Sequence, residues 1–90
     1  MVMLGMNVDE VERVGHGLIS QAGAIEHLIS TVETLVNSAH GAWQGNDSNQ
    51  FLQWWTSQHR PALQHAKDAI HGLGQSALNN ANEQRAVSGH

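Results

Sequence analysis

Apolar residues recur with the period of an α-helix through the first half of the chain. They form three rows with a spacing of seven residues, and neighbouring rows merge into one broad stripe on a helix. The rows are Val11, Leu18, Ile25, Val32 and Ala39; Val14, Gln21, Leu28, Leu35 and Ala42; and Val8, Gly15, Ala22, Ile29, Val36 and Trp43. The pattern predicts a helix over about 7–42, capped by Asn7, with coiled-coil-like, left-handed packing.

A second helical pattern follows over about 47–80. Its rows are Leu52, His59, Ala66 and Leu73; Trp55, Ala62 and Ala69; and Leu63, Ile70 and Ala77. Pro61 removes a backbone donor and clashes with the carbonyl four residues back, so we expect a kink near 57–61. Residues 81–90 are polar and lose the stripe, which predicts a flexible tail, and residues 1–6 are expected to be a flexible arm.

The segment between the two patterns has the composition of a turn. Gly45 can take the left-handed conformation that ends a helix, and Asn46, Asp47 or Ser48 can cap the next one. Asp47 and Gln50 have the spacing of a capping box. The sequence therefore predicts an antiparallel two-helix hairpin that turns at residues 43–46.

Glycines in the first helical pattern leave two interpretations open. Each glycine inside a helix costs about 1 kcal/mol relative to alanine, so the first turns are expected to fray or bend. Alternatively Gly15, which lies in the apolar stripe, lets the backbone of a partner approach closely.

The predicted hairpin has a wider apolar stripe than two helices can cover between them. The remedy is a second hairpin, which gives an all-α four-helix-bundle dimer with either an identical or a different chain. The expected core and dimer-interface residues are Val11, Leu18, Ile25, Leu28, Val32, Leu35, Leu52, Trp55, Leu63, Ile70 and Leu73.

The adjacent residues Trp54 and Trp55 point about 100° apart on a helix. Trp55 shares a row with Ala62 and is predicted to lie in the core. Trp54 lies outside the core rows, and it is interpreted either as a half-exposed cover over the kink or as a hot spot for a further partner.

Composition restricts the function further. The 90 residues include no cysteine, carry a formal net charge of −4, and are only 13 % charged, which argues against disulfides, thiolate metal sites and nucleic-acid binding. The apolar N-terminus is too short for the core of a signal peptide, and no run is long enough to cross a membrane. The scarcity of charge suggests that much of the surface meets protein.

The candidate chemistry is weak. Seven histidines invite a metal hypothesis, yet none makes an i,i+4 pair with another, and no nucleophile is placed beside a base in a recognisable motif. His59 differs from the others because it occupies an expected core row beside the kink. We therefore predict no enzyme activity, no metal and no cofactor. The histidines are His16, His27, His40, His59, His65, His71 and His90.

Trp43-Gln44-Gly45, in the turn of a helical hairpin of nearly one hundred residues, resembles the signature of the WXG-hundred family. These are small proteins of the early-secreted-antigen type, exported by type VII (ESX) secretion systems of actinobacteria and Firmicutes. The resemblance covers about residues 7–80 and carries over only Trp43 and Gly45 as motif residues. The pair of adjacent tryptophans and Pro61 would suit an actinobacterial branch.

The resemblance implies a bundle of two hairpins that forms in the cytoplasm and is exported without a cleaved signal. It implies a role as effector, or as carrier or chaperone for a larger toxin, and contact with a secretion ATPase. The family's export signal, a Tyr followed three residues later by Asp or Glu, is missing because the chain has no tyrosine. Either a partner supplies the signal, or the chain stays in the cytoplasm. The alternative function is an intracellular structural four-helix-bundle homodimer.

Overall fold

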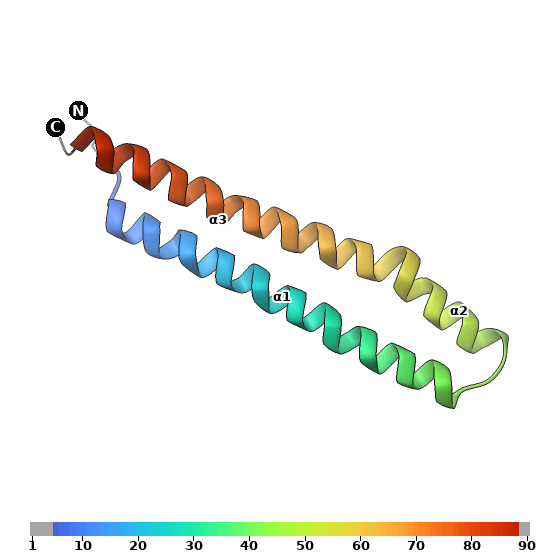
Figure 1. Cartoon of the computed structure of the whole chain (residues 1–90). Coiled ribbons are helices and arrows are strands. Elements are labelled where there is room, and N and C mark those ends of the chain that lie inside the picture. The colour runs from blue at the N-terminus through green and yellow to red at the C-terminus, as the bar shows by residue number, and fades with distance from the viewer. Residues whose placement is uncertain (1–4, 89–90) are drawn as a thin grey trace. The chain divides into compact units, whose positions relative to one another are not determined.

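Helices account for almost all of the part of the chain that the computed structural model describes, residues 5–88 (Figure 1). Helix α1 spans Val8–Ala42, α2 spans Asn46–Trp54, a π-helical turn η1 spans Trp55–His59, and α3 spans Arg60–Ser88. Within residues 5–88 there is no strand, and the chain is all-α as the sequence predicted. Of the arm expected over residues 1–6, the first four residues lie outside the described residues.

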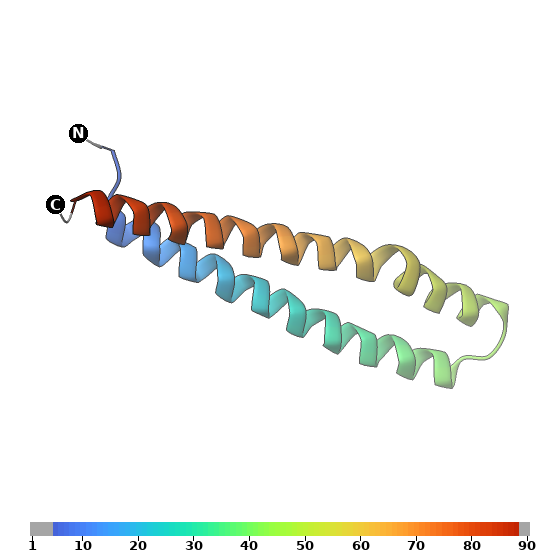
Figure 2. The same cartoon turned by 45° about the horizontal axis from the view of Figure 1, so that its top comes forward.

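The chain divides into two compact units. The turn unit comprises residues 23–67, and the terminal unit comprises residues 1–22 and 68–90. In each unit a segment of α1 lies beside a segment from the second half of the chain in both views (Figures 1 and 2).

The start of α1 is fixed by a side-chain cap, as predicted. Oδ1 of Asn7 accepts a hydrogen bond of 3.1 Å from the backbone N–H of Glu10, and the Asn7 carbonyl accepts one of 3.0 Å from the N–H of Val11. Asp9 and Glu10 place negative charge in the first turn, where the helix dipole favours it.

The turn between α1 and α2 depends on Gly45, whose φ of 112° and ψ of −175° are accessible essentially only to glycine. Gly45 is also the N-cap of α2, and no side chain caps this helix. The prediction that Asn46, Asp47 or Ser48 would cap it was wrong. The Ser48 hydroxyl is fully buried and lies 2.9 Å from Nδ1 of His40. The Ser48 side chain therefore contacts α1 and does not cap α2.

The sequence predicted a kink at Pro61, and the structure has a π-helical turn immediately before it. The Arg60 N–H donates to the carbonyl of Trp55, five residues back. The hydroxyl of Ser57 donates to the Gln53 carbonyl at 2.6 Å, and that of Thr56 donates to the Leu52 carbonyl at 3.1 Å. The ribbon bends where α2 gives way to α3 (Figure 1).

The π-helical turn shifts the face that the second half of the chain buries. A π-helical turn contains one extra residue, so residues spaced by seven that lie on one face before the turn no longer lie on that face after it. The heptad positions beyond the turn are shifted by one residue. Trp55 is buried, but Ala62 and Ala69, which share its row, are exposed. His59 is exposed as well, and its assignment to a core row was wrong. The buried side beyond the turn includes Leu63, Ile70, Gly74, Ala77 and Ala81.

Helix α3 extends further than the sequence indicated. Its end was expected at about residue 80, and it continues to Ser88. Ala81 is fully buried, and the Arg85 guanidinium lies 3.2 Å from a carboxylate oxygen of Asp9 and 3.3 Å from one of Glu12. Residues 81–88 lack an apolar stripe, but most of them have moderate to good helix propensity. The burial of Ala81 and the ion pairs of Arg85 with the start of α1 favour the helix here.

The terminal unit contains a close approach between two backbones. A Cβ atom built on Gly74 would lie 2.8 Å from the Gly15 carbonyl oxygen, and one built on Gly15 would lie 2.9 Å from the side chain of Leu78. Both glycines are buried. The close approach that Gly15 allows is therefore to α3 of the same chain, and α1 is helical through Gly15, Gly17 and Gly23.

Candidate functional site

The three heptad rows of α1 have different degrees of exposure. The row that contains Ala22, Ile29 and Val36 is buried, while the row that contains Ile25 and Val32 is half-buried. The remaining row is the most exposed: Val14 is 42 %, Leu28 47 % and Leu35 63 % exposed. The hairpin thus leaves one apolar row of α1 uncovered.

The core of the turn unit combines predicted and unpredicted residues. Trp55 is 6 % exposed and packs with Ile29 and Val36. Ile25, Val32, Leu52 and Leu63, all of them predicted, pack against this cluster. Of the other predicted interface residues, Val11, Leu18 and Ile70 are half-buried and Leu73 is 61 % exposed. Contact between the exposed residues and a partner remains a prediction.

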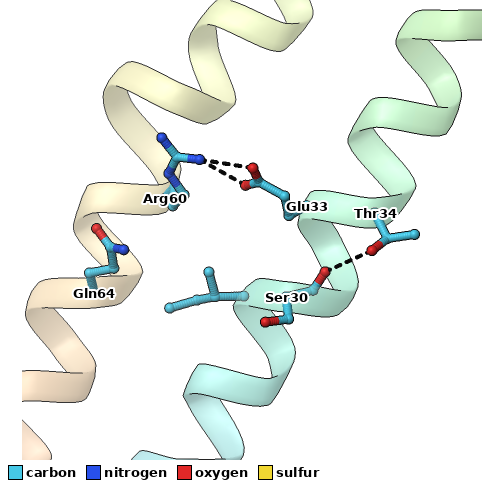
Figure 3. A pocket seen from close by; sticks show the side chains of 6 residues that line it. Ser30, Glu33, Thr34, Arg60 and Gln64 are labelled. Atoms are coloured by element: carbon cyan, nitrogen blue, oxygen red, sulfur yellow. Dashed lines mark hydrogen bonds and ion pairs between the residues drawn. The ribbon is translucent and has the colours of Figure 1, made fainter.

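A carboxylate clamp, formed by Glu33 with Trp55 and Arg60, joins the two sides of the turn unit. The indole N–H of Trp55 donates to Glu33 Oε1 at 2.7 Å, and Nη1 of Arg60 lies 2.9 Å from both Glu33 carboxylate oxygens. Glu33 and Arg60 point toward one another from facing helices (Figure 3). They line a polar hollow of about 540 Å³ with Ile29, Ser30, Thr34 and Gln64.

The clamp lowers the pKa of Glu33 below its ordinary value of 4.5. The hydrogen bond from the Trp55 indole is the largest cause, and the hydrogen bond from Arg60 is the next, while partial desolvation acts in the opposite direction. A lowered pKa in the folded state means that the carboxylate stabilises the fold above its unfolded pKa. That contribution disappears as the pH falls through the folded pKa.

We expect Glu33→Gln to lower stability at neutral pH and to matter less in acid. Glutamine retains an acceptor for the Trp55 indole but loses the charge that binds Arg60. Urea unfolding of both proteins, followed by circular dichroism at neutral pH and at successively lower pH, checks this, because the contribution of the charge is lost as the pH falls through the folded pKa of Glu33.

Glu26→Gln is the matched control, since Glu26 lies on the same flank of α1 and its oxygen is 3.7 Å from Nζ of Lys67. The Glu26 side chain is 67 % exposed, and exposed ion pairs contribute little. A stability difference between wild type and Glu33→Gln that did not shrink on acidification would contradict the role of the charge.

The other flank of the turn unit carries an aromatic hollow of about 320 Å³. Trp54 is 48 % exposed and Phe51 36 % exposed, while Trp55 forms part of the hollow's buried wall. The lining residues are Val32, Val36, Phe51, Trp54, Trp55 and His59. Trp54 thus points away from the core, as its spacing from Trp55 indicated.

Trp43 extends this aromatic surface at the turn. It lies just beyond the end of α1, is 42 % exposed, and its ring centroid is 5.6 Å from that of Phe51, with the planes inclined at 51°. Tilted pairs at this distance are favourable. Trp43 therefore covers Phe51 at the closed end of the hairpin, two residues before Gly45, whose backbone conformation requires glycine.

Two contacts within the turn unit were missed in the sequence, the clamp at Glu33 and the hydrogen bond between His40 and Ser48. Residues equidistant from the turn face one another in a hairpin, and Glu33 and Trp55 are equally far from residue 44. An acidic residue beside the apolar stripe, opposite a tryptophan and an arginine, was the signal that could have revealed the clamp.

Two further observations restrict the chemistry of residues 5–88. No three His, Asp or Glu side chains gather there in an arrangement that could hold a metal ion. None of the helices in this range combines the length and the apolar character that crossing a membrane requires.

Comparison with known proteins gives one match. The family described as WXG100, proteins of 100 residues with WXG, matches residues 4–86, which include the Trp43-Gln44-Gly45 turn. A search of curated proteins and a search of solved structures give no match. The family match extends over almost the whole chain, and the Trp43-Gln44-Gly45 motif within it lies at the turn between α1 and α2. The chain belongs to the WXG100 family.

Proposed function

We propose that the protein is a small component of a type VII secretion system that works by pairing its hairpin with a second one. The observation that carries this is the family match over residues 4–86, since WXG100 membership points to type VII secretion. In this role the dimer assembles in the cytoplasm and is exported without a cleaved signal, as an effector or as a carrier for a larger cargo such as a toxin.

The uncovered row of α1 supports a partner of the same kind. Val14, Leu28 and Leu35 are separated by multiples of seven residues and are about half exposed. Apolar rows of this spacing pack in four-helix bundles. The partner is a second copy or another WXG100 protein, and it lies against this row.

The lack of tyrosine adds a requirement for export. These 90 residues contain no tyrosine, so on this proposal the partner or the cargo supplies a tyrosine-based signal and the contact with the secretion ATPase. On this proposal the protein is exported only as part of a complex. A chain that lacks such a partner remains in the cytoplasm.

Export is tested by expressing the chain with its neighbouring secretion genes and measuring it in the culture supernatant. An intact ATPase should yield the protein in the supernatant, and an ATPase with a disabled nucleotide site should leave it in the cells. A cytosolic marker controls for lysis. Purely cytosolic protein in both strains would favour the alternative of an intracellular structural homodimer.

A further inference from the structure

We propose that the carboxylate clamp is a conformational lock on the π-helical turn. With the clamp closed, residues 55–59 are π-helical and His59 lines the aromatic hollow. With the clamp open, the same residues wind as an α-helix, and His59 turns out of the hollow. The lock lies within the turn unit, and it does not depend on the proposed role in secretion.

The π-helical turn brings both donors of the clamp to one carboxylate. Trp55 and Arg60 are five residues apart, which on an α-helix would place them about 140° from one another. In a π-helical turn five residues make little more than one full turn, so the two side chains lie only about 50° apart. The Arg60 N–H accordingly bonds to the Trp55 carbonyl, and both side chains reach Glu33. An α-helical turn would separate one of the two donors from this acceptor.

The same turn places His59 on the other side of Trp55. On an α-helix His59 would lie about 40° beyond Trp55, whereas in the π-helical turn it lies about 30° short of it. There it lines the aromatic hollow with Phe51 and Trp54. Trp55 connects the two flanks, since its indole N–H donates to Glu33 at 2.7 Å while its ring forms a wall of the hollow. The clamp on one flank therefore determines which side chains line the hollow on the other.

Pro61 brings the free energies of the two windings closer together. Proline has no N–H, so an α-helical turn at this place lacks the hydrogen bond to the Ser57 carbonyl in any case. A π-helical turn also disrupts the α-helical ladder, and Pro61 has already removed one of its bonds. Hydrogen bonds to an ionised carboxylate are about twice as strong as neutral ones, so the bonds that Glu33 accepts from Trp55 and Arg60 can decide between the windings.

The helix beyond the turn has an apolar row for either winding. With the π-helical turn, Leu63 packs against the core cluster, and Ala62 and Ala66 are exposed. Without the extra residue, the row of Trp55 continues through Ala62, and Ala66 follows on the same face. The open state thus packs apolar side chains against α1 as well, although they are smaller than Leu63. It is a second packed arrangement of higher free energy, and such pairs of packings can form a switch.

The test is NMR spectroscopy of the full-length protein labelled with ¹⁵N and ¹³C, because the scalar coupling across a hydrogen bond identifies the acceptor of the Arg60 N–H. The wild type should couple to the carbonyl of Trp55, five residues back. In Glu33→Ala and in Arg60→Met this coupling should be lost, and a coupling to the carbonyl of Thr56, four residues back, should replace it.

Glu26→Ala is the matched control, since it removes the other carboxylate of the same flank, which pairs with Lys67, and leaves the clamp intact. It should keep the coupling of the wild type. Circular dichroism checks that each variant is folded. Arg60→Met keeps the test valid if Glu33→Ala does not fold, because the Arg60 side chain is 32 % exposed and methionine retains much of its aliphatic stem.

A coupling to the Thr56 carbonyl in either clamp variant, but not in the control, would support the lock. Retention of the coupling to Trp55 in the folded clamp variants would overturn it, because Pro61 would then hold the π-helical turn alone. Loss of both couplings in these variants would overturn it as well, since the segment would unwind and not adopt a second winding. A wild type that couples to Thr56 would contradict the proposal from the start.

Discussion

Trp55→Ala is expected to destabilise the protein by about 3–5 kcal/mol, the cost of emptying the space that a buried aromatic ring fills. The Trp55 side chain is 6 % exposed, packs with Ile29 and Val36, and donates its indole N–H to Glu33. For a domain of this size the melting temperature should fall by more than about 12 °C. Thermal unfolding followed by circular dichroism measures this.

Trp54→Ala supplies the control from the neighbouring position. Its ring is 48 % exposed, so its removal should lower the melting temperature much less. Trp55→Phe should fall between the two, since it retains a ring but loses the hydrogen bond to Glu33. All proteins are compared at one concentration, because association itself raises the apparent stability. Equal melting temperatures for Trp54→Ala and Trp55→Ala would contradict the assignment of Trp55 to the core and of Trp54 to the surface.

The periodicity of the sequence was sufficient to predict the helices and the turn. Apolar rows of sevens identified α1, and the glycine and tryptophan of the turn marked its end, because both signals are local in the chain. The Asn7 cap is local too, and the structure has it. Which row faces inward was not predicted, since three adjacent rows are similarly apolar and only the second helix decides between them.

The errors in the second half of the chain have a common origin in Pro61. The sequence indicated a disturbance there but not its form, and a π-helical turn moves every later residue by one position on the helix, whereas a kink would retain the rows. His59 and Ala62 were therefore assigned to the core, and the burial of Gly74 and Ala81 was missed. No local sequence pattern distinguishes a kink from a π-helical turn, because packing against α1 decides between them.

The pairing of distant residues could be predicted only in outline. Gly15 and Gly74 are almost equidistant from the turn, so a hairpin places them near one another, but their close backbone approach depends on the crossing of the helices. The aromatic hollow likewise requires side chains from two helices and the π-helical turn. Of the candidate interface residues, Leu28, Leu35 and Trp54 were named from the sequence, while the recess beside them was not.

The contact between Gly15 and Gly74 predicts opposite effects for two neighbouring glycines of α3. Alanine at position 74 would place its Cβ 2.8 Å from the Gly15 carbonyl oxygen and 3.1 Å from the Ile19 backbone nitrogen, and backbone atoms move only if the helices separate. Such overpacking costs about 1–3 kcal/mol. Alanine at position 72 meets no atom within 4 Å, so Gly72→Ala should gain about 1 kcal/mol from helix propensity.

The comparison of Gly74→Ala with Gly72→Ala isolates the contact, because both substitutions gain similar helix propensity and differ only in what the new methyl group meets. Urea unfolding should rank Gly72→Ala above wild type, and Gly74→Ala should lie about 1–3 kcal/mol below Gly72→Ala. Gly15→Ala should lie between them, since its Cβ would meet the movable side chain of Leu78 at 2.9 Å and the Gly74 carbonyl oxygen less closely, at 3.1 Å. Equal stabilisation by Gly72→Ala and Gly74→Ala would mean that the two backbones do not approach this closely in solution.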